Sequence, residues 1–265
     1  MLNVRSSIIL EHDGPVALIQ LNRPGKLNAL SNELIGAFMA ALDDIELDRS
    51  IRAIVVTGVG RAFSAGADIS EFQPEMEAGP AEAIAGFLRP GQRLTRRGEN
   101  FPKPIIAAVN GLAFGGGCEL VEATHMALAA ETAIFSKAEI HLGIIPTFGG
   151  TQRLPRHVGR KAAIELILSG RRFPAGEAFR LGLVNRVVPA DAVLAETMKL
   201  ALELSEMPPL TISAALSAIH RGMDAAIDDG LAIEEAAFAR IVPTSDAREG
   251  VAAFVEKRSP RFQGR

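Results

Sequence analysis

Two glutamates and a run of three glycines mark the stretch of the chain that could do chemistry. Residues 104–152 read PIIAAVNGLAFGGGCELVEATHMALAAETAIFSKAEIHLGIIPTFGGTQ, and Glu119 and Glu139 stand among mostly apolar residues there. Two carboxylates can supply an acid and a base, and backbone N–H groups at a glycine turn can stabilise a carbonyl oxygen that becomes negative. The combination predicts proton chemistry beside a carbonyl group.

Each of these residues also has an ordinary structural explanation. Glu119 would fall in the first turn of a helix, where a carboxylate complements the helix dipole. Glu139 lies in a strand-like context, FSKAEIHLGII, where an exposed or ion-paired edge residue is the simpler interpretation. Cys118 could be a nucleophile, but a small buried residue is the favoured interpretation. Only the joint occurrence of two carboxylates and the glycines favours an active site.

The elements that would position these residues follow from hydrophobic patterning. Residues 104–109 form a β-branched run that predicts a buried strand, and Gly115–Gly117 then opens a helix whose first N–H groups are free for a ligand. Other strands are expected at 8–11, 16–21, 54–57 and 183–188. Helices are expected from a Ser31 cap to about Asp48, and at 161–168, 174–181, 191–205, 209–222, 225–241 and 245–257.

Residues 71–100 are charged and interrupted by glycine and proline, so a mobile loop is expected there. Phe72, Met76, Phe87 and Leu88 within it could wall a pocket or only cover the core, and the sequence leaves both possibilities open.

Length and composition restrict the class of protein. The chain has 265 residues, of which 48% are apolar and 22% charged, as expected for a folded protein with a large core. A net charge of −3 disfavours nucleic-acid binding, and Arg93, Arg96 and Arg97 are interpreted as a solvated helix face. The five histidines lack a spacing such as HExxH, so no metal site is expected.

Cysteine usage and hydropathy bear on location. One cysteine excludes an intrachain disulfide and favours a reducing compartment. No segment has the layout of a signal peptide or the ~20 apolar residues needed to cross a bilayer. We therefore expect a soluble cytoplasmic protein that neither enters a membrane nor binds nucleic acid.

Several long motifs resemble the enoyl-CoA hydratase/isomerase (crotonase) superfamily over nearly the whole chain. They are NRPGKLNAL at 22–30, GRAFSAGADI at 60–69, KPIIAAVNGLAFGGGCEL at 103–120, GIIPTFGGTQRLPRHVGR at 143–160, AFRLGLVNRVVP at 178–189 and EGVAAFVEKR at 249–258. The resemblance implies an α/β fold, in which a spiral of ββα turns, residues 1–190, binds acyl-CoA. It also implies a C-terminal helical region, residues 191–265, that assembles trimers or dimers of trimers.

The resemblance further implies roles for individual residues. Glu119 would activate water, Glu139 would deliver a proton to the α-carbon, and the amides of Ala67 and Gly116 would form an oxyanion hole. Coenzyme A would contact a set of residues largely through backbone groups: Lys26, Ala65, Ala67, Asp68, Ile69 and Ser70, with Phe254 and Lys257 reaching the adenine of a neighbouring subunit.

The expected reaction is hydration of a trans-2-enoyl-CoA of the fatty-acid type to a 3-hydroxyacyl-CoA, with no cofactor beyond the coenzyme A of the substrate. The alternatives are an enoyl-CoA isomerase or another acyl-CoA-processing member, and, less favoured, a non-catalytic or RNA-associated homologue. Three departures from the family pattern concern the substrate: Ala138 replaces a frequent proline, Thr124-His125 a frequent Cys-Asp pair, and Thr147-Phe148 follows Pro146 where glycine is usual. Acyl-chain length therefore stays open.

Overall fold

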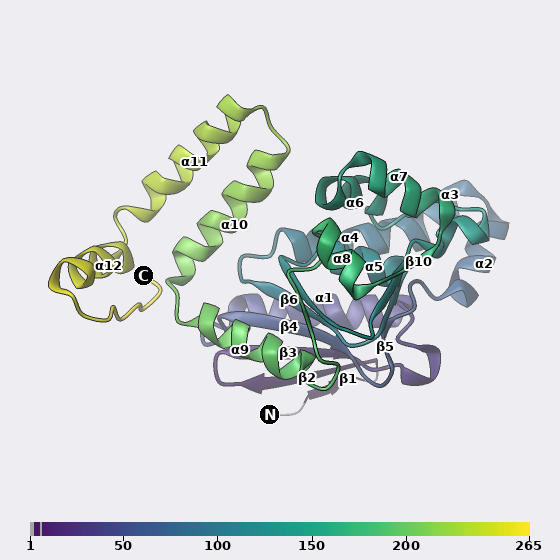
Figure 1. Cartoon of the computed structure of the whole chain (residues 1–265), viewed down its shortest axis with the longest axis horizontal. Coiled ribbons are helices and arrows are strands. Elements are labelled where there is room, and N and C mark those ends of the chain that lie inside the picture. Colours follow the sequence, from purple (N-terminus) through teal and green to yellow (C-terminus); the bar gives the residue numbers. More distant parts are fainter. Residues whose placement is uncertain (1–2, 6) are drawn as a thin grey trace.

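The computed structural model describes residues 3–5 and 7–265 and contains two β-sheets surrounded by helices (Figure 1). The larger sheet has the strand order β1 (Asn3–Arg5), β2 (Ile8–Asp13), β3 (Val16–Leu21), β4 (Ala53–Gly58), β6 (Ile105–Val109), β8 (Met126–Ala130) and β11 (Arg186–Val188). The smaller sheet has the order β10 (Arg172–Pro174), β9 (Ile134–Ser136), β7 (Leu112–Phe114) and β5 (Ala62–Ser64).

Consecutive strands alternate between the two sheets. The first strand of each pair β4–β5, β6–β7 and β8–β9 joins the larger sheet and the second joins the smaller one, with parallel pairing in both sheets. Helical segments follow each pair. This arrangement confirms the expected spiral of ββα turns. The N-terminal hairpin is also confirmed, since β2 and β3 pair antiparallel.

Helices cover both sheets and continue beyond them. The short helical turns are η1 (Pro24–Lys26), η2 (Ile84–Leu88) and η3 (Ala138–Leu142). The α-helices are α1 (Asn32–Leu47), α2 (Ile69–Ala78), α3 (Pro80–Ala83), α4 (Arg89–Glu99), α5 (Gly116–Glu122), α6 (Gly150–Val158), α7 (Arg160–Ser169), α8 (Ala175–Leu181), α9 (Val193–Ser205), α10 (Pro209–Met223), α11 (Ile227–Ile241) and α12 (Ser245–Glu256). The predicted cap of α1 is confirmed, because Ser31 Oγ accepts a hydrogen bond from Leu34 N at 3.2 Å.

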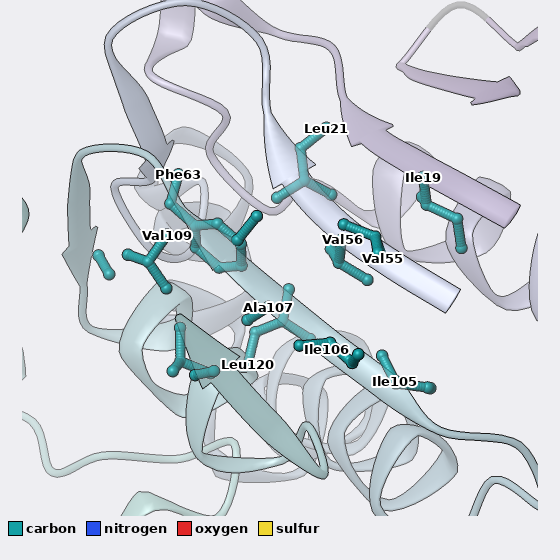
Figure 2. Packing of buried hydrophobic residues seen from close by; sticks show 14 of the residues in the cluster. Ile19, Leu21, Val55, Val56, Phe63, Ile105, Ile106, Ala107, Val109 and Leu120 are labelled. Atoms are coloured by element: carbon teal, nitrogen blue, oxygen red, sulfur yellow. The ribbon is translucent and has the colours of Figure 1, made fainter. Parts of the chain in front are cut away.

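The core lies along the parallel strands of the larger sheet. Every residue of β4 and β6 is buried, which is typical of parallel strands covered on both faces. Figure 2 shows Val55, Val56 and Ile106 packed together, with Leu120 of α5 on the same cluster. The strands that lead to the glycine turn therefore stand on a closely packed base.

The expectation of a mobile loop at residues 71–100 is wrong. This stretch forms α2, α3, a π-helical turn (η2) and α4. Helix α4 buries Gly91, Leu94, Thr95 and Gly98. Because this buried face is made mostly of small residues, it lacks the apolar periodicity by which a packed helix is recognised.

Two further expectations need correction in their local structure. Glu139 lies in the 3₁₀ turn η3 and not in a strand, since β9 ends at Ser136. The strand expected at 183–188 is confined to Arg186–Val188.

The C-terminal helices differ in how they meet the core. Helix α9 packs on the larger sheet and buries Val193, Thr197 and Ala201, whereas α10 and α11 pair with each other and α12 stands apart from the sheets (Figure 1). The division at residue 190 stays a prediction. Within the described residues, the helices are too short or too polar to cross a membrane.

Candidate active site

A small pocket of about 70 Å³ brings together most of the residues expected to do chemistry. Six predicted site residues line it: Ala65, Ala67, Ile69, Gly116, Glu119 and Glu139. They come from the segment after β5, the start of α5 and the turn η3, so the alternation of strands between the sheets is what gathers them.

Two backbone N–H groups lie side by side at one wall of the pocket. A Cβ built at Gly116 would stand 3.5 Å from Ala67 N, and neither Ala67 N nor Gly116 N has a hydrogen-bond partner among the described residues. Gly115, directly before Gly116, has φ 49°, which favours glycine and turns the chain into α5. Two free N–H donors so close together can bind one negatively charged oxygen.

Glu119 is fixed by backbone donors. Its Oε1 accepts hydrogen bonds from Phe148 N at 2.8 Å and from Gly150 N at 2.7 Å, and its side chain is buried. Gly150 is the first residue of α6, so the carboxylate also lies at the positive end of a helix. Sequence analysis missed both donors and the helix itself.

The segment that holds Glu119 is anchored from α4 and α6. Thr95 Oγ1 donates to Phe148 O at 2.6 Å, and Arg153 Nη1 donates to the same oxygen at 3.1 Å. Arg153 in turn pairs with Glu99 at 2.7 Å. These contacts anchor the Phe148–Gly149 peptide group, which lies between the two N–H donors.

Glu139 has different surroundings. It is 7% exposed, and no N–H or hydroxyl group of the described chain donates to either carboxylate oxygen. Its carboxyl group lies close enough to that of Glu119 for the two to share a proton, which lowers its pKa against the effect of burial. Its Cδ lies 3.5 Å from the position that a Cβ would take at Gly115, so the carboxyl group faces the glycine turn. A buried carboxyl group without such donors that borders a pocket is free to exchange a proton with a ligand.

A buried ion pair near Glu119, formed by Lys137 and Glu122, was not expected from the sequence. Lys137 Nζ lies 2.8 Å from Glu122 Oε1, and both side chains are fully buried. One sign of this pair was present in the sequence: each of two apolar segments contains a charged residue, and charged residues are rarely buried unless they are paired.

Burial raises the pKa of the Glu119 carboxyl and also that of Glu139, and in both cases the positive charge of Lys137 opposes the increase. The charges on Glu139 and Glu122 add to the increase at Glu119, because carboxylates so close together resist simultaneous ionisation. The two site glutamates therefore hold protons more readily than exposed ones.

Cys118 fits the interpretation of a small buried residue. Its side chain is fully buried, and burial raises the pKa of the thiol well above its ordinary value. A protonated, inaccessible thiol is a poor nucleophile. No group of three or more His, Cys, Asp or Glu side chains suited to a metal occurs in the described part of the chain.

Only some of the residues expected to contact coenzyme A lie at the pocket. Ala65, Ala67 and Ile69 line the pocket, whereas Lys26 is exposed at the end of η1. Asp68 serves the fold with its side chain: it lies 2.9 Å from Arg23 Nη2 and accepts from Ser70 Oγ at 2.5 Å.

Asp68 Oδ1 also accepts from Ser70 N at 3.2 Å and so caps α2. The Ser70 hydroxyl, more than Arg23, lowers the pKa of Asp68. Phe254 and Lys257 are exposed on and after α12, outside the pocket, and their contact with a neighbouring subunit stays a prediction.

Aromatic side chains close the pocket. The Phe148 ring lies 2.9 Å from the position of a Cβ on Gly116, and it packs on Phe87, with ring centroids 5.3 Å apart. The Phe72 ring also packs on Phe87, with ring centroids 4.1 Å apart. Because Phe87 lines the pocket, the segment 71–100 does contribute to its wall.

Comparisons with known proteins agree with this geometry. The model of the enoyl-CoA hydratase/isomerase family matches residues 11–265. The short-chain-enoyl-CoA hydratase of Clostridium acetobutylicum is 40% identical over 254 residues, which are 96% of each chain. The 2,3-dehydroadipyl-CoA hydratase of Escherichia coli is 40% identical over 260 residues, which are 98% of this chain and 100% of that one.

Solved structures show the same relationship. An enoyl-CoA hydratase from Bacillus anthracis is 36% identical and aligns with a TM-score of 0.91 over 98% of this chain and 100% of that one. A second, from Geobacillus kaustophilus, is 40% identical with a TM-score of 0.91 and 98% of both chains covered. With this fold, this pocket and a match over nearly its whole length, the chain belongs to the enoyl-CoA hydratase/isomerase family.

Proposed function

We propose that this enzyme adds water across the double bond of a trans-2-enoyl-CoA to give a 3-hydroxyacyl-CoA, in the pocket between Glu119 and Glu139. The observation that carries the proposal is that two carboxylates and two unpartnered amides border one small pocket. Relatives with about 40% identity are named as hydratases of enoyl-CoA substrates, which supports the same activity here.

The amides of Ala67 and Gly116 bind the thioester oxygen in this mechanism. As water adds to the β-carbon, electrons of the double bond move toward that oxygen and an enolate forms. Preorganised donors stabilise this charge at the moment it develops, and each is typically worth about 3 kcal/mol of the barrier.

The two glutamates divide the proton transfers. Glu119 takes a proton from water while the oxygen of that water bonds to the β-carbon, and Glu139 gives its proton to the α-carbon as the enolate collapses. Exchange with solvent then restores both groups. Burial favours a protonated Glu139, as its role as an acid requires. Burial also raises the pKa of Glu119, to about 8, which makes it a stronger base once ionised, and its two N–H donors hold the ionised form in place.

Coenzyme A is part of the substrate, and the proposed reaction uses no other cofactor and no metal. The backbone of residues 65–70 and Lys26 would bind it, and Phe254 and Lys257 of a neighbouring subunit would approach its adenine. The cavity volume of about 70 Å³ and the Phe87–Phe148 wall favour a short acyl chain.

The test is a panel of acyl-CoA thioesters analysed by mass spectrometry. Hydration of trans-2-butenoyl-CoA adds the mass of one water, whereas isomerisation of a 3-enoyl-CoA changes the position of the double bond without a change of mass. Turnover of the 3-enoyl-CoA with no hydration would replace the proposal by the isomerase alternative, and binding without turnover would favour a non-catalytic homologue.

We further propose assembly into trimers or dimers of trimers in the cytoplasm. The C-terminal helices leave large apolar side chains exposed, among them Leu231, Phe238, Val251 and Phe254, while Ile233 is half-buried. Apolar faces of this kind are usually covered by another protein surface. Light scattering that shows a monomer at micromolar concentration would contradict the assembly.

A further inference from the structure

A charged pair lies behind the pocket, on the side of Glu119. Lys137, which directly precedes η3, and Glu122 at the end of α5 are fully buried, with Nζ and Oε1 2.8 Å apart. The second oxygen of Glu122 has no hydrogen-bond partner in the described chain. Taking two charges out of water is costly, and an apolar pair of the same size is often as stable, so stability alone is a weak reason for this pair.

Gly150 lies beside both this pair and Glu119, and it has no side chain to fill the space there. A Cβ built on Gly150 would stand 2.5 Å from Lys137 Nζ and 2.9 Å from Glu119 Oε1. Both atoms border the space that a side chain at residue 150 would fill, without forming an ion pair with each other among the described contacts. Lys137 is therefore placed to act on the carboxylate that also accepts the N–H groups of Phe148 and Gly150.

We propose that Lys137 is a positioning residue for Glu119: anchored by Glu122, its ammonium group favours the ionised form of the Glu119 carboxylate that the two backbone donors hold in place. For its catalytic consequence the inference rests on the proposed function, because a base must be ionised to take a proton from water. Lys137 itself is fully buried and does not line the pocket.

The other charged groups around Lys137 have the opposite effect on Glu119 or little effect. Glu122 and Cys118 of α5 and Glu139 of η3 lie near the ammonium group, and all three interact with its charge. His157 of α6 contacts Glu122 O through Nε2 at 2.9 Å. Among the groups that shift the pKa of Glu119, Lys137 is the positive one.

The decisive variant is K137M/E122M, which removes both charges together and leaves no buried ion unpaired. We expect a folded protein in which the low-pH limb of kcat/KM for hydration of trans-2-butenoyl-CoA moves to higher pH. Loss of the nearby cation makes Glu119 hold its proton more tightly, and this effect is larger than the opposite one from losing the charge of Glu122. A shift by one pKa unit corresponds to about tenfold in activity on that limb. A limb at the wild-type position would overturn the inference.

The single variant Glu122→Gln moves the same limb the other way. It removes a negative charge and leaves the cation, so the limb is expected at lower pH. This comparison also decides the matter if the double variant does not fold, since a limb that stays in place or moves to higher pH contradicts the inference. A role limited to packing predicts no such opposite shifts.

A readout without turnover separates this inference from the proposed function. Infrared difference titration follows protonation of the buried carboxyl groups, and Glu119→Gln assigns the Glu119 band. We expect that band to titrate at higher pH in K137M/E122M than in the wild type. An unchanged titration overturns the positioning role, whereas a wild type that titrates as expected but does not hydrate enoyl-CoA overturns only the proposed reaction.

Discussion

The surroundings of Glu119 and Glu139 differ more than the burial of the two side chains. Glu119 is 1% exposed and Glu139 is 7% exposed. Two backbone N–H groups hold Glu119, and contacts from α4 and α6 hold the segment that supplies them. No N–H or hydroxyl group of the described residues donates to Glu139.

This difference bears on what each carboxylate can do. Hydrogen bonds to the ionised form favour a group that stays charged and keeps one orientation, as a base for a small water molecule must. A buried carboxyl group without donors favours its protonated form and can follow the α-carbon. The proposed division of roles follows from this contrast. The predictions below test it, from the largest expected effect to the smallest.

The largest effect is expected from removing either carboxylate. Glu119→Gln keeps an oxygen for both backbone donors, and Glu139→Gln keeps the shape of a side chain without donors, so both variants should fold. Neither amide can exchange the proton, and hydration should fall on the order of a hundredfold or more in each. Initial rates with trans-2-butenoyl-CoA measure this, and Glu131→Gln in an exposed turn is the control.

The outcome of this pair also separates the two activities of the family. Moving a double bond needs one base, whereas hydration needs a group for the water and a source for the α-proton. Full hydration by Glu119→Gln beside an inactive Glu139→Gln would remove the water-activating role and favour the isomerase.

An intermediate effect is expected from disturbing Glu119 without removing it. In Gly150→Ala the new Cβ would stand 2.5 Å from Lys137 Nζ and 2.9 Å from Glu119 Oε1, so the ammonium group and the carboxylate both have to shift. Misplacement of a reacting group by about 1 Å can cost a hundredfold, and a loss of about tenfold or more in kcat is expected. Gly36→Ala in α1 is the matched control, because a Cβ there meets nothing within 4 Å. Equal activity in both variants would show that Glu119 needs no fixed position.

The smallest effect is expected one contact further away. Thr95→Val removes the hydroxyl that donates to Phe148 O, but Arg153 still donates to that oxygen. One hydrogen bond of this kind is worth about 1 kcal/mol, so a lower Tm and a few-fold loss of kcat are expected. Thr197→Val in α9 removes a similar buried bond far from the pocket and should lower Tm alone. If kcat changed in both variants, the effect of Thr95→Val would not be specific to the Phe148 segment.

Much of the fold could be predicted because its local patterns agree with its packing. The buried β-branched strand at 105–109 and the Ser31 cap of α1 follow from residue types. Helix α4 could not be found in this way, because Gly91 and Gly98 let it pack closely with Leu94 as the single large apolar side chain on its buried face. Helix α6 was missed since it begins with glycine and contains Pro155, which ordinarily favour a turn.

The parts of the site that side chains form could be predicted from the sequence, whereas the parts that backbone groups form could not. Glu119 and Glu139 were expected from their residue type, and the resemblance to a family supplied Ala67 and Gly116. The donors to Glu119 are the N–H groups of residues 148 and 150, which have no side-chain signature. The Lys137–Glu122 pair joins positions 15 residues apart that match no short motif, and only the fold brings them together.

The division of roles is tested most directly by proton exchange in D₂O with the saturated substrate butanoyl-CoA, which has no double bond to hydrate. Exchange of its α-proton needs the oxyanion hole and the group that faces the α-carbon, but no activated water. We predict that Glu119→Gln keeps this exchange within a few-fold of the wild type. Glu139→Gln should lose it by about a hundredfold, as measured by deuterium uptake in mass spectrometry. Loss of exchange in Glu119→Gln, or its survival in Glu139→Gln, would contradict the account.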